Sequence, residues 1–235
     1  MLNLPERRSL REDVRAALTR AISHGRFQPG ERIIESQVAR EFAVSQATVR
    51  EALRELESTG LVVYQINRGC VVRKLSRDDV IEMYEMRALL EGEAAERAAS
   101  RLSEQQLDDL ACLIDEMTDL ARADDIVEMS SRDVRFHQTI VEAAGNALLE
   151  RLWLSINPAL WTHLAIIGIL GLPPEKIAER HAAVVEALRK RDPARARTVM
   201  TEHLLGLRDI AAHKLEDDLH RDQRAPLHAL GKERG

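Results

Sequence analysis

A tight connection at residues 43–44 constrains the fold of this chain more than any other feature. A short helix is expected just before it, over residues 35–42. Just after it, Ser45 is placed to cap a third helix, because a serine hydroxyl accepts a hydrogen bond from a free N–H group of the first helical turn. The core face of that helix is expected to hold Val49, Ala52, Leu53 and Leu56. Two helices joined this closely predict a helix-turn-helix.

The flanking sequence extends this motif into a small domain. Apolar residues recur at four-residue spacing and predict a first helix over residues 10–24. Two β-rich runs, 61–64 and 70–73, flank a turn at 67–69 and predict a hairpin, the wing. We therefore expect a winged helix-turn-helix domain over residues 1–74.

The remainder of the chain shows helical periodicity throughout. The expected helices span residues 77–100, 103–122, 126–144, 146–154, 157–170, 174–191 and 193–215. Because each helix must bury its apolar stripe, they are expected to pack as an antiparallel bundle. The predicted fold class is thus mainly α: the winged domain, an all-α antiparallel bundle of six or seven helices over residues 75–216, and a flexible tail over residues 217–235.

Charge is segregated between the two parts. Residues 1–74 contain 13 Lys and Arg against 9 Asp and Glu, a net charge of +4, whereas residues 75–235 contain 21 against 30, a net charge of −9. A basic domain joined to an acidic one is expected when only the first meets phosphate.

Two further features bear on the compartment. Cys70 and Cys112 form no CxxC pair and the N-terminus lacks the apolar core of a signal peptide, which favours a reducing cytoplasm. Residues 152–174 carry no formal charge and are long enough to span a bilayer. Their polar residues and the Pro173-Pro174 pair make a poor span, so we expect buried helices and no membrane partner.

The polar side of the third helix suits the major groove of duplex DNA. Arginine can form two bonds to guanine, glutamine can do the same with adenine, and a small alanine leaves room for a thymine methyl. Hydroxyls at the helix N-terminus suit phosphate contacts, and the hairpin tip can reach the minor groove or the backbone. The predicted DNA contacts are Ser45, Gln46, Ala47, Thr48, Arg50, Arg54, Arg68 and Gly69.

A plainer interpretation exists for the arginines. Arg50 and Arg54 would then only pair with Glu51, Glu55 or Glu57 on a solvated helix. The preceding tight turn and the following wing favour DNA contact instead. Aromatic residues make up only 3% of the chain, so platforms for stacking single-stranded bases are scarce and duplex DNA is preferred over single-stranded RNA.

Three segments of this domain resemble the GntR family of bacterial regulators. They run from Leu18 to Ile33, from Val44 to Val62 and from Asn67 to Gly69, and the match covers nearly all of residues 10–73. The recognition helix departs from the family at Gln46, where Arg is usual, and at Thr48, where Pro is frequent. Since the Arg is lost, the operator sequence of the family does not carry over directly.

Four residues of the predicted bundle form a candidate metal site. Asp133 and His137 are four residues apart and share one helical face. His181 and His203 are each 11 residues from Asp192, and equal distance from the turn of a helical hairpin brings two residues to the same height. One Asp with three His suits a divalent first-row ion, with zinc or nickel preferred. The alternative is that the histidines are hydrogen-bonded core residues.

Residues 80–215 resemble the FadR C-terminal domain of one large GntR subfamily. The matching positions are Met83 to Glu91, Asp133 to His137, Ala143 to Asn146, His181, Arg191-Asp192 and His203. This resemblance implies that the four candidate ligands hold a metal in a cavity and that a carboxylate-bearing metabolite binds beside it.

Two more residues are candidates for contact with such an effector. Arg87 occupies an apolar stripe, where an unpaired charge is costly. It is expected either to bind the carboxylate of the effector, for which arginine is suited, or to pair with an internal Glu. His163, in the uncharged segment, is expected either to line the same cavity or to occupy a core or interface position.

Residues and resemblance together predict a metabolite-responsive repressor. A homodimer is expected to bind a palindromic operator, because one such module reads only a short half-site. A small organic-acid or sugar-acid effector is expected to alter helix packing and so the spacing of the DNA-binding domains. The alternatives are a metal-dependent hydrolase and a metal-free structural DNA-binding protein. The hydrolase is disfavoured because the chain has no HExxH motif and no nucleophile paired with a base.

Overall fold

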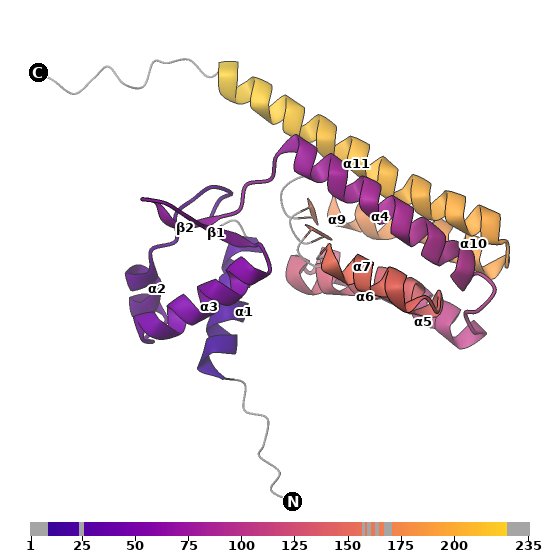
Figure 1. The fold of residues 1–235 in the computed structure, drawn as a ribbon, viewed down its shortest axis with the longest axis horizontal. Coiled ribbons are helices and arrows are strands. Elements are labelled where there is room, and N and C mark those ends of the chain that lie inside the picture. Colours follow the sequence, from indigo (N-terminus) through magenta and orange to yellow (C-terminus); the bar gives the residue numbers. More distant parts are fainter. Residues whose placement is uncertain are drawn as a thin grey trace, which may run out of the picture.

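The computed structural model describes residues 9–23, 26–156, 158, 161–162, 165–166 and 171–224. Within these residues the protein is mainly helical, and its one sheet is a two-stranded antiparallel ribbon (Figure 1). A helix-turn-helix with a small wing comes first in the chain and a set of packed helices follows. The structure therefore confirms the predicted fold class.

The N-terminal unit consists of α1 (Leu10–Ser23), α2 (Glu35–Glu41), α3 (Gln46–Ser58), β1 (Val62–Gln65) and β2 (Gly69–Val72). The two strands pair in register from Val62 opposite Val72 to Gln65 opposite Gly69. In the turn between them, Asn67 and Gly69 adopt positive φ angles of 63° and 76°. Asn and Gly tolerate that left-handed conformation better than other residues, so the sequence fits a tight wing tip.

The connection between α2 and α3 is as tight as its sequence indicates. Ala43 has a φ of 53°, and the Val44 N–H donates to the Ala39 carbonyl at 3.0 Å, which closes α2. The Ser45 side chain then accepts a hydrogen bond from the Thr48 N–H at 3.1 Å, so the predicted cap of α3 is confirmed. The predicted core face is confirmed as well, because its four residues, Val49, Ala52, Leu53 and Leu56, are all buried.

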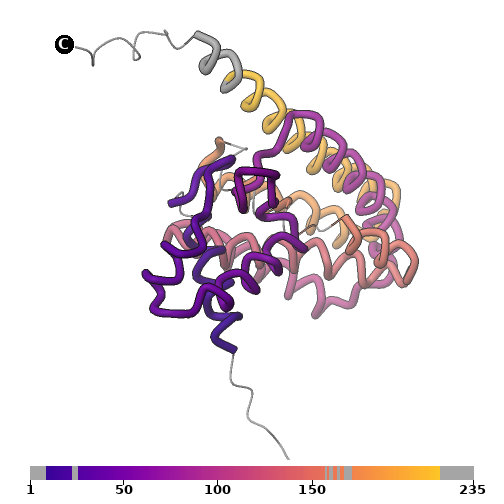
Figure 2. Tube along the Cα trace, turned by 60° about the vertical axis from the view of Figure 1, so that its left-hand side comes forward, coloured from indigo at the N-terminus to yellow at the C-terminus, as the bar shows by residue number. Residues whose placement is uncertain are grey.

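The described residues after the wing form seven helices: α4 (Arg77–Ala98), α5 (Glu104–Arg122), α6 (Ile126–Ala143), α7 (Ala147–Ser155), α9 (Pro174–Glu179), α10 (Ala182–Arg189) and α11 (Pro193–Arg224). Figures 1 and 2 both show α4 and α11 running side by side over most of the length of α4. Helices α5 and α6 pack against each other, and α6 also packs against α4. The buried apolar stripes of these helices meet in one continuous core.

Helix α6 also connects the two parts of the molecule. It packs against α1 of the N-terminal unit. The groove at this contact measures about 360 Å³ and is lined by Thr19 of α1 and by Val127, Ser130, Ser131, Val134, Arg135 and Gln138 of α6. Helix α1 in turn packs against α3, so α6 is linked to α3 through a single helix.

One predicted helix is interrupted. The helix expected over residues 174–191 is divided into α9 and α10 by a turn at Arg180 and His181. At this turn, Nδ1 of His181 lies 3.1 Å from the Ile177 carbonyl and 3.2 Å from the Ala178 carbonyl, while the His181 N–H donates to the Ala178 carbonyl. A regular helix would have paired that N–H with Ile177. Side-chain bonds to nearby backbone carbonyls commonly disturb helices in this way.

Two other expectations differ from the structure or lie outside it. Helix α11 continues to Arg224, nine residues beyond the end expected at residue 215. The sequence holds no proline or glycine between Gly206 and Pro226, and a proline disfavours helical geometry at the residue before it. Most of the helix expected over residues 157–170 lies outside the described residues.

No helix among the described residues is both long enough and apolar enough to cross a membrane. The uncharged segment 152–174, which raised the question, is described only in part.

The close approach of α4 and α11 depends on Gly92. A methyl group at this position would lie 2.6 Å from Thr201 Oγ1, far inside van der Waals contact. We predict that Gly92→Ala lowers the free energy of unfolding by about 1–3 kcal/mol, as overpacked cores do, although Ala favours a helix interior by about 0.5–1 kcal/mol. Urea denaturation measures this change.

The matched control is the double variant Gly92→Ala/Thr201→Ala, compared with Thr201→Ala alone. Removal of the hydroxyl should return most of the lost stability. An unchanged or raised stability in the single Gly92→Ala variant would show that the two helices have room to separate.

Candidate nucleic-acid interface and candidate metal centre

The predicted DNA contacts on α3 lie on its solvent side. Ser45, Gln46, Ala47, Arg50 and Arg54 are exposed and Thr48 is half-buried. They point away from the buried face that packs on α1. In the wing, Arg68 is exposed and donates to the Gln65 side chain at 3.3 Å, and Gly69 is half-buried. The structure thus leaves these side chains accessible to a large partner.

Arg50 has a partner that the sequence did not indicate. Its Nε and Nη2 both donate to Oε2 of Glu35 on α2, at 3.0 and 2.7 Å. Hydrogen bonds from Arg50 lower the pKa of the Glu35 carboxyl, with a smaller contribution from the Tyr64 hydroxyl. Glu55, one of the three expected partners, instead pairs with Arg11 at 2.7 Å. No sequence signal identifies Glu35, because it precedes Arg50 by 15 residues and lies on another helix.

The predicted metal ligands come together from three elements. His137 lies on α6, His181 at the turn before α10 and His203 on α11, and all three are buried. One ligand atom from each lies within 4.8 Å of those of the other two. The ring centroids of His181 and His203 are 4.5 Å apart, as expected from their equal spacing from Asp192.

Asp133, the fourth predicted ligand, lies beside these three histidines, which we call the histidine cluster. Its Oδ2 lies 3.2 Å from Nε2 of His181 and its Oδ1 lies 3.8 Å from Nε2 of His137. Burial alone would raise the pKa of Asp133, but the hydrogen bond from His181 and the charges nearby lower it to about 2. The side chain is therefore a carboxylate at neutral pH.

Contacts outside the cluster orient two of the rings. Nδ1 of His181 lies 3.1 Å from the Ile177 carbonyl, an acceptor that requires a proton on that nitrogen. Nδ1 of His137 lies 2.5 Å from Oε2 of Glu91, although the two groups are not aligned for a hydrogen bond. Nε2 of His181 and Nε2 of His137 both point into the cluster, where the two atoms are 3.3 Å apart.

His203 completes the set with unpaired nitrogens. Neither Nδ1 nor Nε2 has a hydrogen-bond partner among the described residues, although both are buried. Burial, followed by the neighbouring His181 and His137, lowers the pKa of His203 well below its usual value, so the ring is neutral. Buried polar atoms normally have partners. The Asp133 carboxylate and the three buried imidazoles that converge here fit a bound cation, since divalent first-row ions take this ligand set.

Arg87 is paired with an internal glutamate. It is buried, its Nε donates to Oε1 of Glu91 at 2.6 Å, and its Nη1 donates to Oγ1 of Thr162 at 3.2 Å. The indole N–H of Trp153 donates to the same Glu91 oxygen at 2.8 Å. Burial would raise the pKa of Glu91, but Arg87 and His137 outweigh it and hold it well below its usual range.

Glu91 therefore joins Arg87 to the histidine cluster. It was not singled out from the sequence, although its position four residues after Arg87 is a usable signal for a helical ion pair. His163, the second candidate for effector contact, lies outside the described residues.

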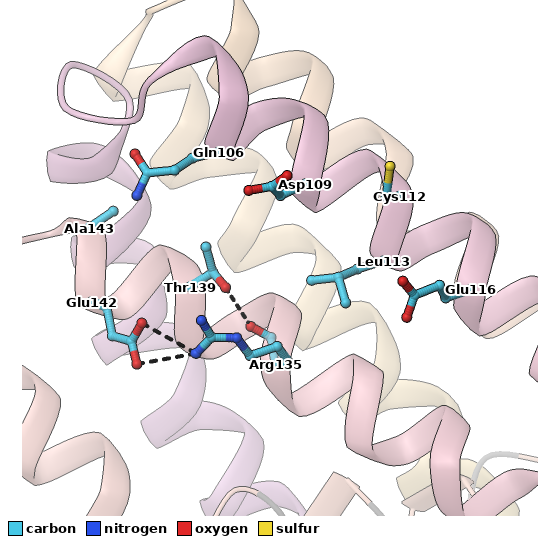
Figure 3. A pocket seen from close by; sticks show the side chains of 9 residues that line it. All are labelled: Gln106, Asp109, Cys112, Leu113, Glu116, Arg135, Thr139, Glu142 and Ala143. Atoms are coloured by element: carbon cyan, nitrogen blue, oxygen red, sulfur yellow. Dashed lines mark hydrogen bonds and ion pairs between the residues drawn. The ribbon is translucent and has the colours of Figure 1, made fainter.

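A separate groove of about 570 Å³ lies between α5 and α6 (Figure 3). It is lined by Gln106, Asp109, Cys112, Leu113 and Glu116 of α5 and by Arg135, Thr139, Glu142 and Ala143 of α6. Arg135 follows Asp133 by two residues and so points to the other side of α6. None of the predicted site residues lines this groove.

Both parts of the chain match known families. Residues 10–72 match "Bacterial regulatory proteins, gntR family", and residues 82–206 match the "FCD domain". The chain belongs to the GntR family. It is a member with an N-terminal GntR helix-turn-helix and a C-terminal FCD domain, as its resemblance to the FadR-like regulators implied.

Similar proteins agree with this assignment. The chain is 31% identical over 207 residues to the "Probable D-xylose utilization operon transcriptional repressor" of Paenarthrobacter nicotinovorans, covering 88% of this chain and 91% of that protein. It is 28% identical over 201 residues to the "Gluconate operon transcriptional repressor" of Bacillus subtilis (strain 168), covering 83% and 81%.

Solved structures share the fold. E. coli McbR/YncC aligns with a TM-score of 0.66 at 21% identity, covering 88% of this chain and 99% of that one. A GntR regulator from Rhodococcus sp. RHA1 aligns with a TM-score of 0.68 at 22% identity, covering 85% and 95%.

The relatives are transcription regulators and not enzymes. This GntR regulator is accordingly a DNA-binding transcription regulator with a ligand-binding FCD domain. The hydrolase alternative is set aside.

The buried pair of Arg87 and Glu91 yields a stability prediction. Glu91→Ala leaves the Arg87 charge buried without its carboxylate, so the free energy of unfolding should fall by about 3–5 kcal/mol. Glu91→Gln keeps an acceptor oxygen and should cost less. Urea denaturation of the three proteins gives the comparison, and equal stability of wild type and Glu91→Ala would mean that Arg87 reaches solvent.

Proposed function

We propose that this GntR regulator is a metabolite-responsive repressor that binds a palindromic operator as a homodimer. A divalent metal and a small carboxylate-bearing effector occupy the FCD domain and modulate that binding. The observation that carries the proposal is the buried convergence of Asp133, His137, His181 and His203, in which neither ring nitrogen of His203 has a hydrogen-bond partner among the described residues.

Exposure and charge support docking of α3 in the major groove. Arg50 and Arg54 suit guanine, Gln46 suits adenine, and Ala47 leaves space for a thymine methyl. The hydroxyls of Ser45 and Thr48, together with the N-terminus of α3, suit a phosphate. Arg68 and Gly69 at the wing tip suit the adjoining minor groove or backbone.

The contacts that two candidate ligands make outside the cluster support the proposed metal site. Metal-binding histidines usually donate their other ring N–H to a carboxylate or a carbonyl, which fixes the ring. His181 makes such a contact with the Ile177 carbonyl, and Glu91 lies beside His137. Zinc or nickel is the proposed ion, which would supply a positive charge and an attachment point for an anionic ligand.

The chemistry of the cavity favours a carboxylate as effector. Arg87 lies close enough to Asp133 and His203 to affect the pKa of both, so a carboxylate held at the histidine cluster would feel its charge. Glu91 and Thr162 engage three of its five N–H donors, and no partner for the other two lies among the described residues. The gluconate operon repressor among the relatives supports a sugar acid as one candidate class.

Exposed apolar side chains support the homodimer. Met86 and Leu89 on α4 are 44% and 58% exposed, and Leu148 and Leu152 on α7 are 57% and 48% exposed. Helices α4 and α7 pack against each other, so we infer that these exposed residues contribute to one apolar face of the FCD domain. A second copy that covers this face would place two recognition helices on two half-sites.

Helix α6 provides a physical route from effector to DNA. Asp133 and His137 on its inner face belong to the histidine cluster, while Ser130, Val134 and other residues of the same helix line the contact with α1. Binding in the cavity that shifts α6 would therefore move α1 and the helix packed on it. Two states of this contact would differ in the spacing of the two recognition helices.

The metal proposal predicts a specific loss. His203→Ala should reduce the metal that copurifies with the protein from near stoichiometric to a small fraction, because it removes a ligand. His213→Ala is the matched control, since that side chain is 77% exposed on the same helix. Mass spectrometry after dialysis gives the metal content, and circular dichroism checks the fold. Equal metal content in both variants would contradict the proposal.

The effector proposal predicts stabilisation that depends on metal. Gluconate and other sugar or organic acids should raise the melting temperature of the metal-loaded protein, since saturation at a hundredfold excess over Kd contributes about 2.7 kcal/mol. Chelation should abolish this shift. Glucose is the matched ligand without a carboxylate, and an equal shift with glucose, or one that survives chelation, would count against a metal-held carboxylate.

A further inference from the structure

We propose that Glu35 is a positioning residue for operator discrimination: it holds one edge of the Arg50 guanidinium and leaves the other edge to read a guanine. The inference rests on the proposed role of Arg50 as a base-reading residue. Glu35 itself is not expected to touch a base. It acts by fixing the direction in which Arg50 leaves α3.

The contacts of Glu35 tie together three elements of the N-terminal unit. Glu35 is the first residue of α2, Arg50 lies on α3, and Tyr64 lies on β1 of the wing. Oε2 of Glu35 accepts both bonds from Arg50, at 3.0 and 2.7 Å, and Oε1 accepts the hydroxyl of Tyr64 at 3.0 Å. One carboxylate thus holds the recognition helix to its neighbouring helix and to the wing.

The pair of Glu35 and Arg50 differs from an ordinary surface ion pair in the burial of its carboxylate. The Glu35 side chain is 20% exposed, whereas that of Arg50 is 51% exposed. Burial of Tyr64 and its bond to Glu35 raise the pKa of the phenol, so it remains a donor at neutral pH. With both oxygens occupied from different directions, Glu35 has little freedom to rotate, and the Arg50 edge bonded to it is fixed.

The donor inventory of arginine shows what remains for DNA. A guanidinium has five N–H donors, and Glu35 engages Nε and one hydrogen of Nη2. The free edge is formed by the two terminal nitrogens. Guanine presents O6 and N7 as two adjacent acceptors in the major groove, so this edge can bind it end-on with two bonds. Without Glu35, Arg50 can swing to a phosphate, which carries no sequence information.

The charge of Glu35 gives the proposal a distinctive signature. A carboxylate near the DNA backbone repels phosphates, so its removal should leave affinity for arbitrary DNA equal or higher. Loss of orientation at Arg50 should at the same time lower affinity for the preferred sequence. A general loss of folding would weaken binding to every sequence, so opposite effects on the two duplexes identify a positioning role.

The experiment uses the full-length protein and two duplexes of equal composition. One is the duplex that the wild-type protein selects from a random-sequence library, and the other is its scrambled counterpart. Fluorescence anisotropy gives both affinities for Glu35→Ala, Arg50→Ala, the double variant, and the control Glu51→Ala. The control removes a carboxylate from an exposed position next to Arg50 for which the structure gives no partner among the described residues.

We expect Glu35→Ala to lower the ratio of selected to scrambled affinity by about tenfold or more, with no loss of affinity for the scrambled duplex. Glu51→Ala should leave the ratio unchanged. In the Arg50→Ala background, Glu35→Ala should lower the ratio no further, because the two residues act through one contact. Repeated selection with Glu35→Ala should relax the requirement for guanine at one position of each half-site.

Two results would overturn the inference in distinguishable ways. If Arg50→Ala keeps the wild-type ratio, Arg50 does not read a base and the proposed docking of α3 fails. If Arg50→Ala lowers the ratio while Glu35→Ala matches Glu51→Ala, the docking stands and the positioning role of Glu35 is wrong. Tyr64→Phe, which retains the Glu35 to Arg50 pair, should lower the ratio less than Glu35→Ala does.

Discussion

The buried convergence of Asp133 with three imidazoles is the constraint on which the rest of this GntR regulator depends. The ligands come from α6, from the turn before α10 and from α11, so a shared cation would lock three separate parts of the FCD domain to one point. This arrangement carries a free-energy cost: the helix is interrupted at His181, the Asp133 carboxylate is desolvated, and the nitrogens of His203 have no hydrogen bond within the described part of the chain. A core built only for packing would use apolar residues in these places.

Around this centre, a second layer connects the site to the rest of the fold. Glu91 accepts hydrogen bonds from the Arg87 guanidinium and the Trp153 indole and lies beside His137. These contacts connect α4 and α7 to the histidine cluster. Helix α6 continues from the histidine cluster to α1, and α1 packs on the recognition helix. An anionic ligand that competes with Glu91 for Arg87 would thus disturb contacts that extend to the DNA-binding unit.

Sequence reasoning reached the fold and the gathering of the four candidate ligands because both depend on regular periodicity. The cap at Ser45, the core face of α3 and the meeting of His181 with His203 follow from helical spacing and turn chemistry. The missed features depend on individual long-range or side-chain contacts. Glu35 reaches Arg50 only because the turn at Ala43 folds α2 against α3, and the break at His181 coincides with a contact between a ring nitrogen and a backbone carbonyl. Neither has a periodic signature.

The most direct test of the central claim is anomalous diffraction from crystals of the protein purified without chelator, collected at the zinc and nickel absorption edges. The account predicts one strong peak enclosed by Asp133, His137, His181 and His203, with ligand distances of about 2.0–2.2 Å. A featureless map at this position at both edges, with the four side chains still in place and hydrogen-bonded to one another, would contradict it.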